Sequence, residues 1–186
     1  MNEDDVLDDV CARLDGLGIP YALTGGLAVS YYGRPRATHD ADIVVAIARV
    51  PGLPQKLIVK FEPDYYISEE AVIDALLHQT MFNIIHPHTG FKIDFWILKS
   101  DSFSQGAFRR RQTVSLGKQR LSILSLEDLI LSKLQWYQLS QSDRHLNDIR
   151  GILAVQREAL NKAYLNEWAK KLSVDEVLSA VWTESE

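Results

Sequence analysis

The fold of this chain is decided by residues 40–48, which read DADIVVAIA. Acidic residues and then β-branched ones alternate with small or apolar residues, a pattern that favours a β-strand. Side chains two residues apart on a strand project from the same face, so Asp40 and Asp42 point together while the apolar residues between and after them face the core. We therefore expect a strand over 40–48 that begins with two carboxylates and is bounded by Pro51 and Gly52.

The carboxylate pair needs support from its context. By chance, 25 acidic residues in a chain of 186 give about three pairs at this spacing, so the spacing alone decides nothing. Two carboxylates about 5–6 Å apart repel each other by roughly 3 kcal/mol at an effective dielectric constant of about 20. A bound cation would offset that repulsion. Exposed acids at the start of a strand, or a salt bridge to an arginine, are the plain alternatives.

A third carboxylate, Asp94, interrupts a second apolar strand, which we expect over residues 91–98. Its apolar side chains fall on one face, and Asp94 falls on the other. Residues 81–85 form the first arm of a predicted hairpin whose loop is 86–90. If this hairpin lies beside the strand at 40–48, three carboxylates converge on a site of hard oxygen ligands that suits Mg²⁺ or Mn²⁺. Zinc is disfavoured, because no set of Cys and His residues has ligand spacing.

Upstream of the carboxylates, Gly25 and Gly26 occupy the turn between a short predicted strand and a short helix over 27–32. Glycines let the backbone approach a phosphate and aim the N–H groups of the following helix at it. A simple tight turn explains the two glycines equally well. The loop that follows contributes Arg36 and Thr38.

Two further candidates, Lys133 and Asp148, come from predicted helices near the C-terminus. Lys133 falls in the middle of the apolar stripe of a helix over 125–139, where a charge is unexpected. A buried lysine needs an anionic partner, so Lys133 either pairs with a carboxylate or faces a cleft and meets a phosphate, which we favour. Asp148 lies at the edge of the apolar face of its own helix, where an exposed acid is equally natural.

The order of the predicted elements is mixed β and α first, then helices alone. The fold class is therefore α+β: a mixed β-sheet with flanking helices, followed by a helical C-terminal part. We expect a core over 1–124 and a helical part over 125–186, either packed on the core or continuous with it.

Length and composition favour one ordinary globular domain, since 46% of the 186 residues are hydrophobic and 24% are charged. The net charge of −5 argues against a protein that coats nucleic acid non-specifically. The arginine run 109–111, with Lys118 and Arg120, could touch an RNA backbone, but we expect a solvated loop. The apolar runs fall far short of the roughly 20 residues that span a bilayer, so no membrane partner is expected. With a single cysteine, Cys11, and no secretory start, the expected location is the cytoplasm.

Taken together, the glycine pair, the loop with Arg36 and Thr38, the paired Asp40 and Asp42, and the distant Asp94 resemble the nucleotidyltransferase superfamily related to DNA polymerase β. Four further segments look like a bacterial nucleotidyltransferase-like family that is similar to the transferases of abortive-infection and toxin–antitoxin systems. These segments are residues 64–71, 81–86, 91–95 and 125–133. The likeness covers about residues 19–154.

The resemblance implies a nucleotidyltransferase-like fold and metal-dependent transfer of a nucleoside monophosphate from a nucleoside triphosphate to an acceptor hydroxyl. It implies two Mg²⁺ or Mn²⁺ ions on the catalytic residues Asp40, Asp42 and Asp94. The residues around the nucleotide would then be Gly25, Gly26, Arg36, Thr38, Lys133 and Asp148.

The resemblance leaves several acceptors open: a tRNA, a protein or a small molecule. It also suggests an antitoxin protein as a partner. The alternative is a catalytically silent member that binds a nucleotide or a partner protein through the same cleft.

Overall fold

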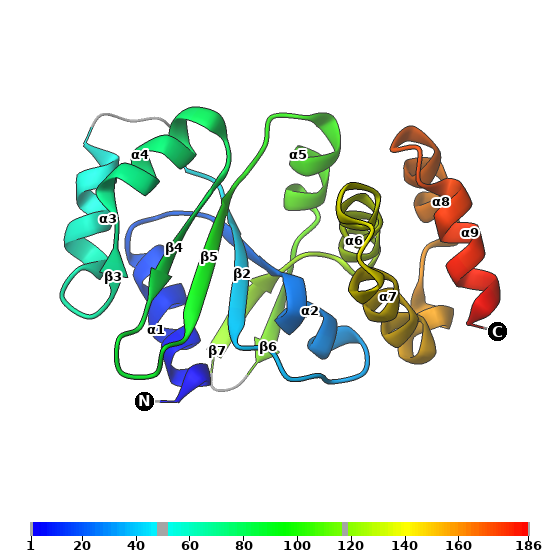
Figure 1. Ribbon diagram of the computed structural model, residues 1–186, viewed down its shortest axis with the longest axis horizontal. Coiled ribbons are helices and arrows are strands. Elements are labelled where there is room, and N and C mark those ends of the chain that lie inside the picture. The colour runs from blue at the N-terminus through cyan, green and yellow to red at the C-terminus, as the bar shows by residue number, and fades with distance from the viewer. Residues whose placement is uncertain (1, 48–51, 117–118, 186) are drawn as a thin grey trace.

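The computed structural model describes residues 2–47, 52–116 and 119–185, and a mixed β-sheet runs through its centre (Figure 1). In space, the seven strands of this sheet are ordered β3-β4-β5-β2-β1-β7-β6. Their bounds are β1 Tyr21–Thr24, β2 Asp40–Val45, β3 Tyr66–Ile67, β4 Met81–Ile85, β5 Lys92–Ile97, β6 Gln112–Leu116 and β7 Gln119–Ile123. β2 pairs with β5 and β1 with β7 in parallel, and the other neighbouring strands are antiparallel.

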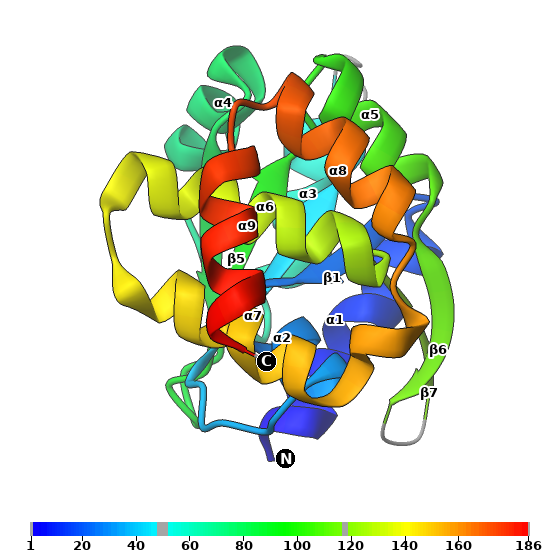
Figure 2. The ribbon, with the colours of Figure 1, turned by 90° about the vertical axis from the view of Figure 1, so that its right-hand side faces the viewer.

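Helices flank the sheet and continue beyond it as an outer layer. Toward one side lie α1 Glu3–Gly16, α3 Leu53–Phe61 and α4 Glu69–His78, and toward the other lie α2 Gly25–Tyr32, α6 Leu126–Ser140 and α7 Asp143–Gln156 (Figure 1). Figure 2 shows α8 Lys162–Lys171 and α9 Asp175–Glu184 outside α6 and α7. The remaining helices are α5 Ser102–Arg109 and the 3-10 turn Arg157–Ala159. The predicted α+β class with a helical C-terminal part is confirmed.

The alternation in β2 explains how this strand is held. Ala41, Ile43 and Val45 are fully buried, whereas the residues between them are half-buried on the opposite face. One hydrophobic cluster extends from Val6 in α1 to Val181 in α9. Burial of apolar surface of this kind is the main stabilising contribution to a fold. The division between residues 1–124 and 125–186 stays a prediction, because the core is continuous across it.

Several predicted boundaries shift in the structure. The strand expected over 40–48 ends at Val45, and Ala48 and Pro51 lie outside the described residues. The helix expected over 27–32 already begins at Gly25, because Thr24 takes the extended backbone of an N-cap residue. This earlier start brings both glycines into the first turn of α2.

Within the arginine run 109–111, Arg109 is exposed as its charge predicts, whereas Arg110 departs from the predicted solvated loop. Lys118 lies outside the described residues. Arg110 reaches the fully buried Asp128 of α6, with 3.1 Å from Nε to Oδ2 and 2.5 Å from Nη2 to Oδ1. Its guanidinium also lies 4.3 Å from the ring centroid of Tyr164 in α8. Tyr164 and Ser125 donate to the same carboxylate at 2.8 and 2.5 Å. Arg110 therefore fastens the helical layer to the end of α5.

Every helix in the described ranges is too short or too polar to traverse a lipid bilayer.

Candidate active site

Two parallel strands bring the three predicted carboxylates to one face of the sheet. The register of β2 and β5 places Asp42 opposite Asp94 and Asp40 opposite Lys92. Because side chains alternate along a strand, Asp40, Asp42 and Asp94 all project from the face that lies opposite the buried Ala41. The strand pairing on which the sequence made this convergence conditional is thus present, and the metal site itself stays a prediction.

Asp94 is the most constrained of these acids. Its residue is only 7% exposed, and one oxygen, Oδ2, accepts a hydrogen bond of 2.7 Å from Lys92 Nζ. The other oxygen, Oδ1, is buried and has no hydrogen-bond partner within the described part of the chain. Burial raises the pKa of Asp94, and the charges of Asp42 and Asp40 act in the same direction against the opposing effect of Lys92.

Lys92 is a site residue that the sequence analysis did not single out. It lies on β5 two residues before Asp94, so simple strand alternation places the two side chains on one face. The hydrogen bond to Asp94 raises the pKa of Lys92, and the nearby charges of Asp40 and Asp42 add to this effect. Its ammonium group therefore supplies positive charge among three carboxylates.

Asp40 and Asp42 are each held by one neighbour. Thr38 Oγ1 donates to Asp40 Oδ1 at 2.7 Å, which makes Thr38 a positioning residue for a carboxylate. Trp96, which follows Asp94 by two residues on β5, donates from Nε1 to Asp42 Oδ1 at 3.1 Å. The two acids thus keep fixed orientations on the open face of the sheet.

The donor set fits a hard divalent cation such as Mg²⁺ or Mn²⁺. It consists of carboxylate oxygens, and Asp94 Oδ1 is a buried acceptor with an unmet demand for a cation or a hydrogen-bond donor. As the side chains stand, no three Asp, Glu, His or Cys residues among those described form a ready ligand cluster. Asp40, Asp42 and Asp94 point to Thr38, Trp96 and Lys92 instead. Metal binding requires these side chains to turn toward a common point.

The glycine pair lies directly against this acidic face. Gly25 has a φ of +63°, and a β-carbon at this position would overlap the carboxylate of Asp42. A β-carbon at Gly26 would come within 2.8 Å of Thr38 Oγ1 and 3.0 Å of Arg36 Nη2. In the part of the chain that the structure describes, no side chain caps the N-terminus of α2, so its first N–H groups can face an anion.

Arg36 and Lys133 both bind the carboxylate of Asp148, and all three residues were predicted to lie around the nucleotide. Arg36 Nε lies 2.8 Å from Asp148 Oδ1, and Lys133 Nζ lies 2.9 Å from Oδ2. Asp148 is 3% exposed and Lys133 8%, so the acid is not the exposed residue that its helix allowed. Burial alone would raise the pKa of Asp148, but hydrogen bonds from Arg36 and Lys133 outweigh it and lower the pKa. Two cations on one carboxylate leave a net positive charge near Gly26.

The contact between α2 and α7 sets the distance from Arg36 to Asp148. At the end of α2, a β-carbon on Gly33 would come within 2.8 Å of Gly151 O and Ile152 N in α7. The two helices consequently meet backbone to backbone at this point. This close approach brings the Asp148 side chain within reach of the loop after α2.

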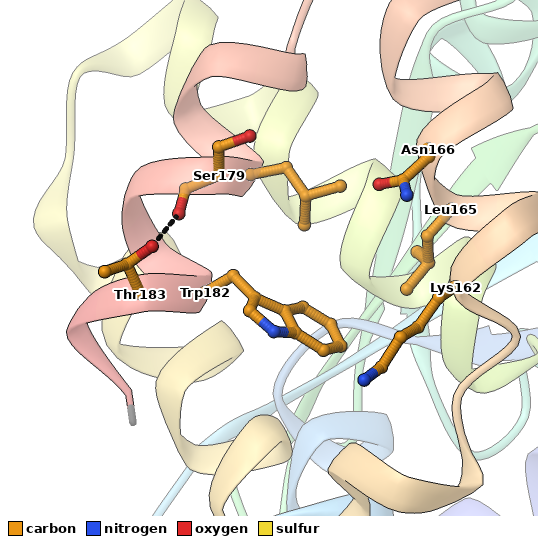
Figure 3. A pocket seen from close by; sticks show the side chains of 7 residues that line it. Lys162, Leu165, Asn166, Ser179, Trp182 and Thr183 are labelled. Carbon is orange, nitrogen blue, oxygen red and sulfur yellow. Dashed lines mark hydrogen bonds between the residues drawn. The ribbon is translucent and has the colours of Figure 1, made fainter.

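Side chains of α8 and α9 line a hollow (Figure 3). It is lined by Lys162, Leu165, Asn166, Leu178, Ser179, Trp182 and Thr183. Trp182 there carries the cations of Arg157 and Lys162 at 5.0 and 5.1 Å from its ring centroid. α6 and α7 stand between this hollow and the sheet (Figure 1). With no carboxylate in its lining, it lacks the groups that the predicted chemistry needs.

Comparison with solved structures identifies the architecture. A nucleotidyltransferase-like protein from Paracoccidioides brasiliensis superposes with a TM-score of 0.59 at 20% identity, over 97% of this chain and 92% of that one. The chain has the nucleotidyltransferase fold.

Antibiotic adenylyltransferases share this fold. ANT(2″)-Ia in complex with adenylyl-2″-tobramycin gives a TM-score of 0.57 at 13% identity, with 98% of both chains covered. The lincosamide antibiotic adenylyltransferase LnuA, bound to lincomycin, gives 0.50 at 15% identity over 82% of this chain and 96% of that one. No family model and no curated protein sequence matches the chain. The nucleotidyltransferase fold predicted from the resemblance is therefore confirmed by structure.

Proposed function

We propose that this protein transfers a nucleoside monophosphate from a nucleoside triphosphate to an acceptor hydroxyl with the help of two divalent metal ions. The observation that carries the proposal is the pairing of Asp42 with Asp94 on parallel strands beside a glycine turn, where Asp94 Oδ1 has no partner among the described residues. Asp40, Asp42 and Asp94 would hold Mg²⁺ or Mn²⁺. When bound, such ions neutralise the phosphates and align the α-phosphate for in-line attack.

The protein's own groups would divide the remaining work. Gly25 and Gly26 would cradle the phosphates through the N–H groups of α2, and the surplus positive charge of Arg36 and Lys133 would neutralise them. Thr38 and Asp148 would act as positioning residues, the first on Asp40 and the second on the two cations.

The reaction forms a bond from the acceptor oxygen to the α-phosphorus and breaks the bond to the bridging oxygen of the β-phosphate, so that pyrophosphate leaves. The proton of the acceptor hydroxyl would pass to a carboxylate oxygen, for which Asp94 Oδ1 is free of protein partners in the described residues. Among the acceptors left open, the two antibiotic adenylyltransferases of the same fold favour a small hydroxyl-bearing molecule for the first screen. A tRNA or protein acceptor and an antitoxin partner stay predictions.

Titration of a non-hydrolysable nucleoside triphosphate, with and without Mg²⁺, tests the proposal in wild type and in Asp42→Asn. We expect metal-dependent binding that the variant loses while its circular dichroism spectrum stays unchanged. Asp15→Asn, an exposed acid on α1, is the matched control and should bind as wild type. Turnover with any acceptor that survives Asp42→Asn would rule the mechanism out.

A second variant, Lys92→Met, tests whether the Lys92 ammonium group occupies the position among the carboxylates at which a metal ion would bind. Removing it should tighten Mn²⁺ binding about fivefold, or about 1 kcal/mol, because one nearby positive charge is gone. Lys99→Met, an exposed lysine just after β5, serves as the control. Electron paramagnetic resonance of free Mn²⁺ measures both affinities without any acceptor.

The second candidate function is a catalytically silent protein that binds a nucleotide or a partner through the same face. The observation in its favour is that each predicted catalytic carboxylate already holds a side-chain partner: Thr38 on Asp40, Trp96 on Asp42 and Lys92 on Asp94. A silent scaffold would bind nucleoside triphosphates without dependence on Mg²⁺ or on Asp42, or would not bind them at all. The same titration therefore separates the two functions.

A further inference from the structure

Two tryptophans extend the acidic face in one direction. Trp96 follows Asp94 by two residues on β5, and its indole Nε1 donates to Asp42 Oδ1 at 3.1 Å. Its ring and that of Trp136 from α6 form an edge-to-face pair, with 5.2 Å between centroids and 65° between planes. Trp136 lies one helical turn beyond Lys133, on a helix that already borders the site. Trp96 thus contacts a predicted catalytic carboxylate directly, and Trp136 is joined to that carboxylate through Trp96.

Trp136 remains 42% exposed although it packs against Trp96. The other two tryptophans carry cations, Lys171 on Trp168 and both Arg157 and Lys162 on Trp182. Within the described ranges, no lysine or arginine lies over the ring of Trp136. An indole face left open beside a polar site is suited to a flat ligand group.

We propose that Trp136, supported by Trp96, is the stacking subsite for the base of the nucleotide. This inference rests on the proposed function, because the position of the phosphates fixes the direction of the ligand. Asp42 Oδ2 faces Gly25, and its other oxygen, Oδ1, faces Trp96. A triphosphate that runs from the α-phosphate at Asp42 toward the glycine turn sends its ribose and base the opposite way. The tryptophan pair lies on that side.

Stacking of this kind recognises the flat face that every base presents and involves no reading of base edges. The subsite should accept purines and pyrimidines with modest differences, because stacking strength and not hydrogen bonding sets the preference. Trp96 has a second task, since its hydrogen bond fixes Asp42. Trp136 is therefore the residue to change.

The experiment titrates three probes with Mg²⁺: non-hydrolysable analogues of ATP and of UTP, and inorganic tripolyphosphate. Wild type is compared with Trp136→Ala, Trp136→Phe and, as a matched control far from the carboxylates, Trp182→Phe. We expect Trp136→Ala to bind both nucleotides about tenfold more weakly while tripolyphosphate binding stays unchanged. Trp136→Phe should recover most of the loss, and Trp182→Phe should match wild type. Both nucleotides should quench tryptophan fluorescence in wild type, and much less in Trp136→Phe.

Each outcome decides between the two proposals. Nucleotide affinity that is equal in Trp136→Ala and wild type overturns the stacking subsite, even if turnover falls because the ring serves the acceptor. Failure of wild type to bind either nucleotide also overturns it. Loss of nucleotide affinity in Trp136→Ala, together with no tripolyphosphate binding and no effect of Asp42→Asn, supports the subsite while removing the proposed transferase function.

Discussion

Asp128 and Asp94 are both buried carboxylates paired with a basic side chain, yet they differ in how their oxygens are used. Asp128 accepts hydrogen bonds from Arg110, Tyr164 and Ser125, so both of its oxygens are occupied. Asp94 has Lys92 on one oxygen and nothing on the other within the described residues. The first arrangement is complete by itself, whereas the second has an acceptor left over.

The comparison shows that a shifted pKa alone does not identify a functional acid. Burial raises the pKa of Asp128 and of Asp94 alike, despite the basic partner that each has. What separates them is the count of hydrogen-bond donors around each carboxylate. A buried acceptor without a donor is costly to keep, so its presence calls for a ligand or a reacting group.

The largest effect is expected from Asp128→Ala, which breaks the complete cluster. Arg110 and Tyr164 would lose their shared acceptor, and the free energy of unfolding should fall by about 3 kcal/mol. Urea denaturation at neutral pH measures this loss. Asp15→Ala, at an exposed position on α1, should change it by less than about 0.5 kcal/mol. A loss of similar size in both variants would mean that the cluster is not what fastens α8 to α6.

A smaller effect that depends on pH is expected from Asp148→Asn. The pKa of Asp148 is lowered below its ordinary value of 3.8, so its folded form favours the charged state. Asp148 should contribute about 2 kcal/mol to the free energy of unfolding, as a buried acid whose partner Arg36 is partly exposed. This contribution should be complete well above pH 3.8 and disappear as the pH falls through the lowered pKa. Urea midpoints of wild type and variant from pH 7 to pH 3 should therefore converge in acid. A gap that stays constant over this range would contradict the assignment.

The smallest effect on stability is expected from Asp94→Asn, the other side of the comparison. The change removes a buried charge close to Asp40 and Asp42, and Lys92, whose side chain is 38% exposed, can turn to water. The free energy of unfolding should stay within about 0.5 kcal/mol of wild type or rise slightly, while Mn²⁺ binding is lost. A destabilisation as large as that of Asp128→Ala would make Asp94 a structural acid.

Much of the site is local in sequence and could be predicted. The two-residue period of a strand is enough to put Asp40 beside Asp42, and the same rule, had it been applied to β5, would have paired Lys92 with Asp94. The pairing of β2 with β5 is different, since more than fifty residues separate Asp40 from Asp94 and no short-range pattern sets that register.

The residues that sequence reasoning misplaced have partners that are distant in the chain. Arg110 looks like part of a solvated basic run, because Asp128 and Tyr164 come together with it only after α6 and α8 have packed. For Asp148 the sequence left an exposed acid and a site residue equally open, because its partner Arg36 is 112 positions away. The charge of a segment and its amphipathic period predict its local structure and its exposure. They do not predict which distant side chain will contact it in the folded protein.

The contact at Gly33 has a consequence for how this sequence can vary. Any residue with a side chain at position 33 would act as a wedge between α2 and the backbone at Gly151 and Ile152. Such a wedge would lift α7 and carry Asp148 away from Arg36, although position 33 touches neither a carboxylate of the sheet nor a predicted ligand. Position 33 is therefore expected to accept only glycine, and a substitution there should weaken the contact between Asp148 and Arg36 from a distance, with every carboxylate of the sheet left in place.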